Sequence, residues 1–292
     1  ASTFGFPGRR IPGSAVCRSH RVRRGHAGAN HFPGHPGDGG RLALAGALLH
    51  VWNHGVFKAL LFFSAGSVLH ATGTREMSRL GGLWRTMPWT TGLFALGAVA
   101  VAGLPPLNGF VSEWLVYLGL FEAVTSKSPA AWAAMPAAIM LAMAGAIAMA
   151  SFAKAGAMIF LGAPRTQAAE TAHEGGNWMR GPMLVLAGVC VVIGLAPMLV
   201  SPAVGRAVAE WHPAWAGLEA PAPLFTLGSV HVGLLILVLA AVAWLWRKAQ
   251  ANGLRRGLTW DCGFAMPTTR MQYTSGSFAG IATGWFRWIL QP

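Results

Sequence analysis

Long apolar stretches, separated by short segments rich in Arg, Gly and Pro, make up most of the chain from residue 41 onward. Such runs are typical of helices that span a bilayer, because about 20 apolar residues cross its hydrocarbon core. The pattern predicts helices over residues 42–70, 130–161, 181–200 and 224–246, and a longer apolar segment over 89–123. The sequence therefore predicts an all-α, polytopic transmembrane bundle.

The segment over 89–123 is too long for one straight span, and its middle contains strong helix breakers. Gly103, Pro105, Pro106 and Gly109 lie within 103–109. Proline cannot donate a backbone hydrogen bond, and irregular backbone at membrane depth is tolerated only where protein or a water-filled cavity satisfies it. We therefore expect one broken helix here.

The charges of the loops indicate how often the broken segment crosses. If it crosses once, one side of the membrane carries Arg75, Arg79, Arg85, Arg165, Arg180, Arg247, Lys248, Arg255, Arg256 and Arg270. The other side then carries Lys127 and Arg206 together with Glu122, Glu210 and Glu219. Because Lys and Arg concentrate in cytoplasmic loops, this asymmetry favours a single interrupted crossing.

Residues 1–40 differ from the rest of the chain. They show no periodicity, are rich in Gly, Pro, Arg and His, and lack the apolar region of a signal peptide. A disordered basic arm is one interpretation; we favour a coding region read out of frame and joined to the true frame near Arg41. The predicted domains are thus this segment, a transmembrane domain over 41–247, and a cytoplasmic loop with an amphipathic or partial terminal helix over 248–292.

Composition excludes a water-soluble globular protein. Apolar residues make up 54% of the 292 residues, charged residues 11%, and the mean hydropathy is +0.48, whereas soluble domains carry about 25% charged residues. The net charge of +13 does not indicate nucleic-acid binding. Residues 1–41 hold seven Arg against one Asp, which is nearly half of the excess positive charge, and most of the remaining Lys and Arg lie in loops between apolar runs, where they set the topology of the spans. Cys17, Cys190 and Cys262 have no paired spacing, so neither a disulfide framework nor a zinc site is predicted.

His50, His54 and Lys58 follow one another at intervals of four on the first predicted helix. Each interval is about 6 Å of rise and about 40° of rotation, so the three form one stripe. Neutral imidazole both donates and accepts, and a Lys removed from water can load and release a proton. We predict a proton relay; the alternative is a polar contact between helices with Lys58 snorkelling to an interface.

Further ionisable residues fall inside the next two apolar segments. Glu113 follows the helix break, and Lys154 lies within the run over 130–161. Charges inside a bilayer are costly and are functional candidates by default, although a structural Glu and a snorkelling Lys are the alternatives. Lys58, Glu113 and Lys154 thus place one ionisable group on each of three successive spans. His70, at the end of the first predicted helix, is either an exit group or an interfacial residue.

A metal ion or haem is a weaker interpretation of the histidines. The four-residue spacing of His50 and His54 could hold a metal, but no Asp or Glu accompanies them and Lys58 would repel a cation. Haem between helices usually takes His from different helices, and only His231 offers itself elsewhere in the spans. With no nucleotide-binding, CxxC or nucleophile motif, we predict no bound cofactor.

Two motifs resemble the antiporter-like subunits of complex I and of multi-subunit sodium/proton antiporters. HVWNHGVFKALLFFSAGSV, residues 50–68, resembles that family's His-x3-His-x3-Lys helix, and GLPPLNGFVSEW, residues 103–114, resembles its broken helix. Three further segments are similar to the antiporter-like component B of hydrogenase-4 and its formate hydrogenlyase counterpart: LHATGTREMSRLGGLWRTMP, FAKAGAMIFLGAPR and TWDCGFAMPTTRMQYTSGSFA.

The resemblance implies a partial antiporter-like fold and a role for each candidate. His50, His54 and Lys58 would belong to the central proton relay, Glu113 to the terminal channel, and Lys154 to a position seen in the hydrogenase branch. The family's first half, with its own Glu and Lys pair in an inverted repeat, is absent from this sequence.

The implied function is proton translocation across the bacterial cytoplasmic membrane. Redox chemistry would belong to partner subunits with iron–sulfur clusters and nickel–iron or quinone sites, so the chain would not be catalytic alone. Two alternatives stay open: a sodium/proton antiporter subunit, and a non-conducting membrane anchor for soluble hydrogenase subunits.

Overall fold

The computed structural model describes residues 38–125, 131–215 and 222–251, and beyond these residues 253, 268, 271–274, 276, 277, 279–285 and 287–290. The chain divides into the units Ala1–Gly34 and His35–Pro292, and every described residue belongs to the second. The segment predicted to differ from the rest, residues 1–40, lies outside the described residues except for its last three.

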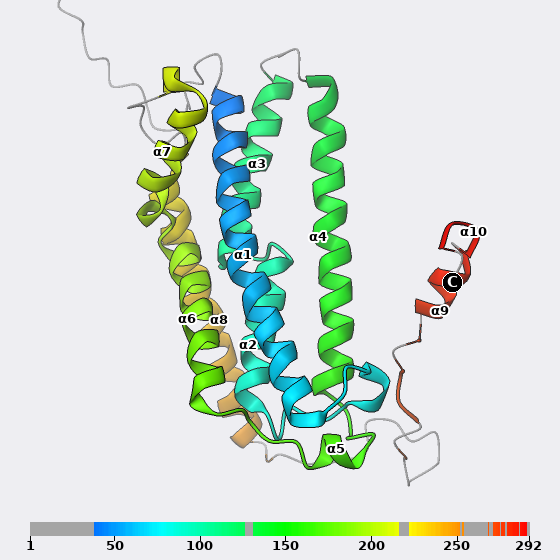
Figure 1. Cartoon of the computed structure of the whole chain (residues 1–292). Helices are drawn as coiled ribbons and strands as arrows, with labels where there is room; N and C mark the ends of the chain where they lie inside the picture. Colours follow the sequence, from blue (N-terminus) through cyan, green and yellow to red (C-terminus); the bar gives the residue numbers. More distant parts are fainter. Residues whose placement is uncertain are drawn as a thin grey trace, which may run out of the picture. The chain divides into compact units, whose positions relative to one another are not determined.

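Helices form the regular structure of the described residues (Figure 1). The longer ones are α1 (Asp38–Thr72), α2 (Pro88–Val101), α3 (Asn108–Thr125), α4 (Ala131–Phe160), α6 (Asn177–Leu195), α7 (Ser201–Trp211) and α8 (Leu224–Ala251). Short helices are α5 (Gln167–Glu170), α9 (Ala279–Trp285) and α10 (Arg287–Leu290), with 3-10 turns η1 (Met77–Arg79), η2 (Pro197–Leu199) and η3 (Pro213–Trp215). Within the described part of the chain, four helices are long and apolar enough to cross a membrane: α1, α4, α6 and α8.

The predicted broken helix is the pair α2 and α3, and its two halves lie end to end along α1 (Figure 1). Ser67 Oγ of α1 lies 3.2 Å from Thr90 Oγ1 of α2. Nearer the middle of α1, Asn53 Nδ2 donates to the Asn108 carbonyl at the start of α3, at 2.8 Å. Farther along, α1 packs so closely on Gly119 of α3 that a Cβ there would overlap the α1 backbone. This arrangement is that of a single interrupted crossing.

The break follows from its residues. Gly103 has a φ of +63°, in the left-handed region that glycine adopts without a steric cost. Pro105 and Pro106 supply no N–H to continue the hydrogen-bond ladder of α2. The new helix then starts at Asn108, and a Cβ at Gly109 would overlap the Ala100 carbonyl of α2. Two glycines and two prolines thus both stop one helix and let the next approach it closely.

Two basic loops share one end of the bundle. Thr166 Oγ1 donates to the Arg79 carbonyl at 2.9 Å, and Arg165 donates to the Leu80 carbonyl. Glu174 accepts from Thr90 N at 3.0 Å and from its hydroxyl at 2.9 Å, which places a carboxylate at the positive end of the α2 dipole. The sharing of one end by these loops agrees with the expected topology. Five residues used for that expectation lie outside the described residues: Lys127, Glu219, Arg255, Arg256 and Arg270.

The outward surface of the bundle is apolar. Large side chains exposed on α4 and α8 include Trp132, Met140, Ile147, Ile236, Leu237 and Trp244. Apolar surface of this extent is compatible with lipid rather than water. The predicted all-α, polytopic bundle with one broken helix is therefore confirmed. Several predicted boundaries differ by four or five residues: α1 and α6 each begin four residues earlier than expected, and α8 continues five residues farther, to Ala251. The helix expected over 181–200 ends at Leu195, because Pro197 starts a 3-10 turn that leads into α7.

Candidate functional site

The stripe on α1 begins inside the bundle. His50 is half-buried, and its Nδ1 lies 3.1 Å from Ser112 Oγ on α3. The Ser112 hydroxyl also lies 2.9 Å from the Gly109 carbonyl just after the break, to which it can donate. His50 is therefore tied by hydrogen bonds to the first turn of α3.

The stripe then turns outward at His54. The ring centroids of His50 and His54 are 5.9 Å apart, a separation that leaves room for a bridging water. His54 packs against the buried Phe57 ring at 5.2 Å, yet it is exposed, on a surface of α1 that also presents Val51 and Phe62. Regular four-residue spacing thus brings the two imidazoles together, but only His50 lies within the bundle of described helices.

Lys58 points toward α4. Its side chain is half-buried, and Nζ lies 5.5 Å from the centroid of the Phe152 ring. An ammonium over an aromatic face is stabilised electrostatically where water is scarce. Lys58 stands 14 residues from the nearer end of α1, about 21 Å along the helix axis. A side chain directed at a neighbouring helix from this depth faces the bundle interior and not an interface.

Glu113 lies beside the break, on the side that faces α4. Its half-buried carboxylate lines a cavity of about 280 Å³ together with Gly103, Tyr117 and Gly145. A Cβ added at Gly103 would overlap the carboxylate, and a Cβ at Gly145 would lie 4.0 Å from Oε2. The missing side chain of Gly103 therefore makes the space that the carboxylate occupies.

Lys58 and Glu113 both approach one face of α4. Their neighbours Phe152 and Gly145 are seven residues apart, two helical turns and about 10 Å along the axis. A second cavity of about 300 Å³, lined by the Phe152 side chain, adjoins the first. The two cavities share Ala102, Leu104 and Met149. The structure thus brings Lys58 and Glu113 to the same face of α4, and the cavity beside Glu113 adjoins one lined by Phe152, the residue that Lys58 contacts.

Two asparagines at the break were not predicted. Asn53 and Asn108 are fully buried, and Asn53 Oδ1 and both polar side-chain atoms of Asn108 have no protein partner in the described part of the chain. An unpaired buried amide costs about 1–3 kcal/mol, and ordered water is the usual way in which proteins satisfy such groups. The break is therefore a polar site that favours internal water. An Asn beside the predicted helix break was the signal available in the sequence.

His231 is a third polar residue next to the break. It is 2% exposed, its Nδ1 lies 2.7 Å from the Gly194 carbonyl, and its ring packs edge-on against Phe110. Since a carbonyl only accepts, Nδ1 carries the proton, and Nε2 is left as an acceptor without a protein partner among the described residues. From the sequence, His231 was expected only as a possible haem ligand; its place as a lone His within an apolar span is the signal for a buried polar site.

Two predicted residues lie apart from this arrangement. Lys154 Nζ donates to the Ser277 carbonyl of the C-terminal segment at 2.6 Å. His70 is exposed near the end of α1, beside the basic loops. Among the described residues, no group of three or more His, Cys, Asp or Glu comes together that could hold a metal ion.

Sequence comparison relates the chain to known membrane proteins. The family NADH:quinone oxidoreductase/Mrp antiporter, TM matches residues 38–134, which span α1, the break and the start of α4. Hydrogenase-4 component B of Escherichia coli (strain K12) is 35% identical over 235 residues, which are 76% of this chain and 35% of that protein. Formate hydrogenlyase subunit 3 of the same organism is 36% identical over 225 residues, 76% of this chain and 36% of that protein. The chain thus spans about a third of the length of these relatives.

A solved structure supports the same fold. The membrane-bound sulfane sulfur reductase, described as an archaeal respiratory membrane complex, contains a chain that matches with a TM-score of 0.61 and 23% identity. The match covers 85% of this chain and 40% of the other.

Proposed function

We propose that the chain, whose residues 38–134 match the NADH:quinone oxidoreductase/Mrp antiporter family, conducts protons across the bilayer through α1 and the α2–α3 break. One observation carries this proposal: Lys58 lies over Phe152 and Glu113 lies beside Gly145, two residues on one face of α4 that are about 10 Å apart along its axis. A cation and an acid at this spacing can exchange a proton through a short chain of water molecules.

The route that we propose runs from the α1 stripe to the break. His50 and His54 would deliver a proton to Lys58, and Glu113 would receive it. Two unit charges about 10 Å apart attract by about 1.7 kcal/mol at an effective dielectric constant of about 20. That energy corresponds to an almost twentyfold step in an equilibrium constant, enough to couple the two groups without locking them as an ion pair.

The unpaired amides of the break support hydration of this route. Asn53 and Asn108 lie between the α1 stripe and α3, and internal water on their free polar atoms would extend the hydrogen-bonded path. Lys154 and His70 have no place in this short route, because one is bonded to the C-terminal segment and the other lies at the end of α1.

We further propose that the chain acts within a multi-subunit complex in a bacterial cytoplasmic membrane. Its relatives named above are components of hydrogenase-4 and formate hydrogenlyase. Partner subunits with iron–sulfur and nickel–iron centres would carry the redox chemistry. Helices outside this chain would cover the exposed surface of α1 around His54, where an imidazole among apolar side chains needs a polar partner.

The experiment replaces Lys58 with Ala and measures redox turnover and proton uptake together in membrane vesicles of the source organism. Lys248→Ala is the matched control, because that Lys also lies over an aromatic ring, Trp244 at 5.1 Å, but is exposed near the end of α8. We expect Lys58→Ala to lose proton uptake while the redox reaction continues, and Lys248→Ala to pump normally.

The other outcomes separate the alternatives. Unchanged proton uptake in Lys58→Ala contradicts the proposal. If both Lys58→Ala and Glu113→Gln assemble and pump as the unmodified protein does, the chain is a membrane anchor. Proton flux that requires sodium identifies it as an antiporter subunit.

A further inference from the structure

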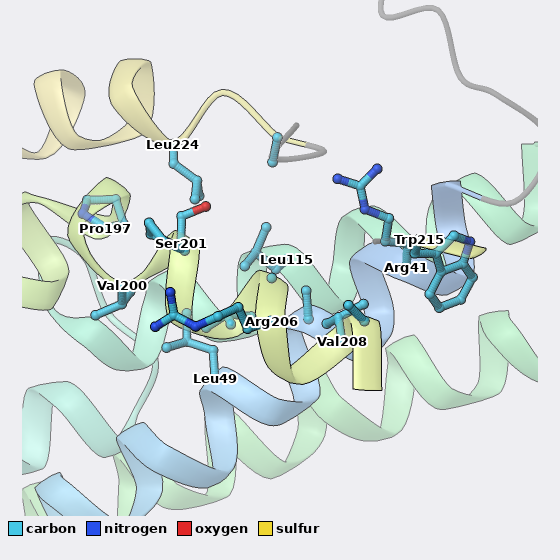
Figure 2. A pocket seen from close by; sticks show the side chains of 16 residues that line it. Arg41, Leu49, Leu115, Pro197, Val200, Ser201, Arg206, Val208, Trp215 and Leu224 are labelled. Carbon is cyan, nitrogen blue, oxygen red and sulfur yellow. The ribbon is translucent and has the colours of Figure 1, made fainter. Parts of the chain in front are cut away.

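A cavity of about 490 Å³ lies away from the proposed proton route. It opens between the first turns of α1, the middle of α3, η2 with α7, and the start of α8 (Figure 2). Most of its lining is aliphatic: Ala45, Leu49, Leu115, Val200, Val204 and Leu224 belong to it. It shares no lining residue with the two cavities beside Lys58 and Glu113.

Cationic and aromatic residues occupy parts of this otherwise apolar wall. Figure 2 shows Arg41 and Trp215 side by side at one end of the cavity, and Arg206 farther along it on α7. Arg41 is only 8% exposed, although its side chain is charged. A guanidinium has five N–H donors, so it can bind an anion in addition to partners within the protein.

The residues that line this cavity lie at depths that correspond to different layers of a bilayer. The middle of α1 is residue 55, close to the contact of Asn53 with the break. From there Arg41 lies about 21 Å along the helix and Leu49 about 9 Å. Half of the hydrocarbon core is about 15 Å and half of the bilayer with headgroups is about 20–22 Å. Arg41 is therefore at headgroup depth, while Leu49 is at the depth of the acyl chains.

We propose that this cavity binds one anionic phospholipid. The phosphate would lie against the Arg41 guanidinium, which matches phosphate oxygens with two parallel hydrogen bonds. Trp215 suits the same level, because indole rings concentrate at membrane interfaces. An acyl chain would follow Leu49, Leu115 and Val200 inward. The lipid would thereby bridge α1 to α7 and α8, independently of whether the protein conducts protons.

The test is native mass spectrometry of the full chain, purified in mild detergent, stripped of lipid and then offered phosphatidylglycerol or phosphatidylcholine in mixed micelles. We expect one retained phosphatidylglycerol per chain, and about tenfold weaker retention of phosphatidylcholine. Arg41→Gln should weaken phosphatidylglycerol retention about tenfold through the lost charge-assisted hydrogen bonds. Arg41→Lys should restore part of it, and Arg79→Gln, at the other end of the bundle, should change nothing.

A second variant tests the part of the site that would hold the acyl chain, without changing a charged residue. Gly205 lines the cavity, and a Cβ there meets nothing within 4 Å, so Gly205→Leu should fill the space and abolish retention. Gly233→Leu on α8 is the matched control, since it is equally unobstructed but does not line the cavity. Circular dichroism verifies that each variant is folded.

Three results would overturn the proposal. One is equal retention of phosphatidylglycerol by the unmodified chain and by folded Arg41→Gln and Gly205→Leu variants. Another is equal retention of the anionic and the zwitterionic lipid. The third is displacement of the lipid by millimolar inorganic phosphate alone, because the site would then recognise a free anion and not a membrane lipid.

Discussion

Replacement of Gly103 by Ala tests the most specific feature of the site, the space in which the Glu113 carboxylate lies. Gly103 has a φ of +63°, and a Cβ there would overlap the carboxylate. The substitution therefore has two effects: it strains the backbone, and it drives the Glu113 side chain from its position beside α4. Gly73→Ala is a matched control, because Gly73 has a φ of +67° and a Cβ there meets nothing within 4 Å.

The two effects differ in size and in kind. A non-glycine residue in the left-handed region costs about 1–2 kcal/mol, which both variants should show as lower stability. Forcing Glu113 off its rotamer adds about 0.5–1.5 kcal/mol in Gly103→Ala only. A carboxylate shift of about 2 Å changes its attraction to Lys58 by only about 0.3 kcal/mol. A loss of conduction would therefore come from a broken hydrogen-bonded path, which depends on atoms within about 3 Å, and not from weaker electrostatics.

The assays are thermal unfolding of the purified chain and proton uptake in membrane vesicles. We expect Gly103→Ala to be about 1 kcal/mol less stable than Gly73→Ala and to take up protons at least tenfold more slowly, while Gly73→Ala pumps normally. Adding Glu113→Asp to Gly103→Ala shortens the acid by one methylene and should restore part of the uptake. Equal proton uptake by Gly103→Ala and Gly73→Ala would refute the reasoning.

Three other substitutions test the surroundings of the break. Asn53→Leu removes the donor of the 2.8 Å bond to the Asn108 carbonyl, which keeps the Ser112 hydroxyl as a second donor, so thermal unfolding should show a loss of about 0.5–1.5 kcal/mol; no loss would mean that the bond does not form. His231→Phe should lower the stability of the protein by a similar amount, because it removes the bond from Nδ1 to the Gly194 carbonyl of α6. His231→Asn, which can donate to that carbonyl, should recover part of the lost stability; equal stability of the two variants would contradict a stabilising role of the bond. Lys154→Met should speed proteolysis of the C-terminal segment without altering proton uptake, since its ammonium binds a carbonyl there; slower uptake would instead place Lys154 in the route.

The helices themselves were predictable, because their causes are local. Long apolar runs form membrane-spanning helices without depending on particular neighbours. The Gly and Pro residues of 103–109 break the helix locally, because Pro has a fixed φ and no backbone N–H and Gly readily leaves the helical conformation. The shared end of the basic loops, observed for the loops with Arg79 and Arg165, also follows from charge alone. The end of α6 was misplaced, because the apolar run continues past Pro197 while the helix does not.

The direction in which each side chain points depends on how the helices pack. Four-residue spacing fixes His50, His54 and Lys58 relative to one another, but helix packing turns His50 toward Ser112 and leaves His54 outside. Contacts between helices that are distant in sequence bring Lys58 and Glu113 to one face of α4. Periodicity determines angles within a helix, whereas burial depends on which neighbour covers each face. For that reason the spans and the ionisable residues can be predicted from local sequence, whereas the packing of the helices decides which of those residues can share a path.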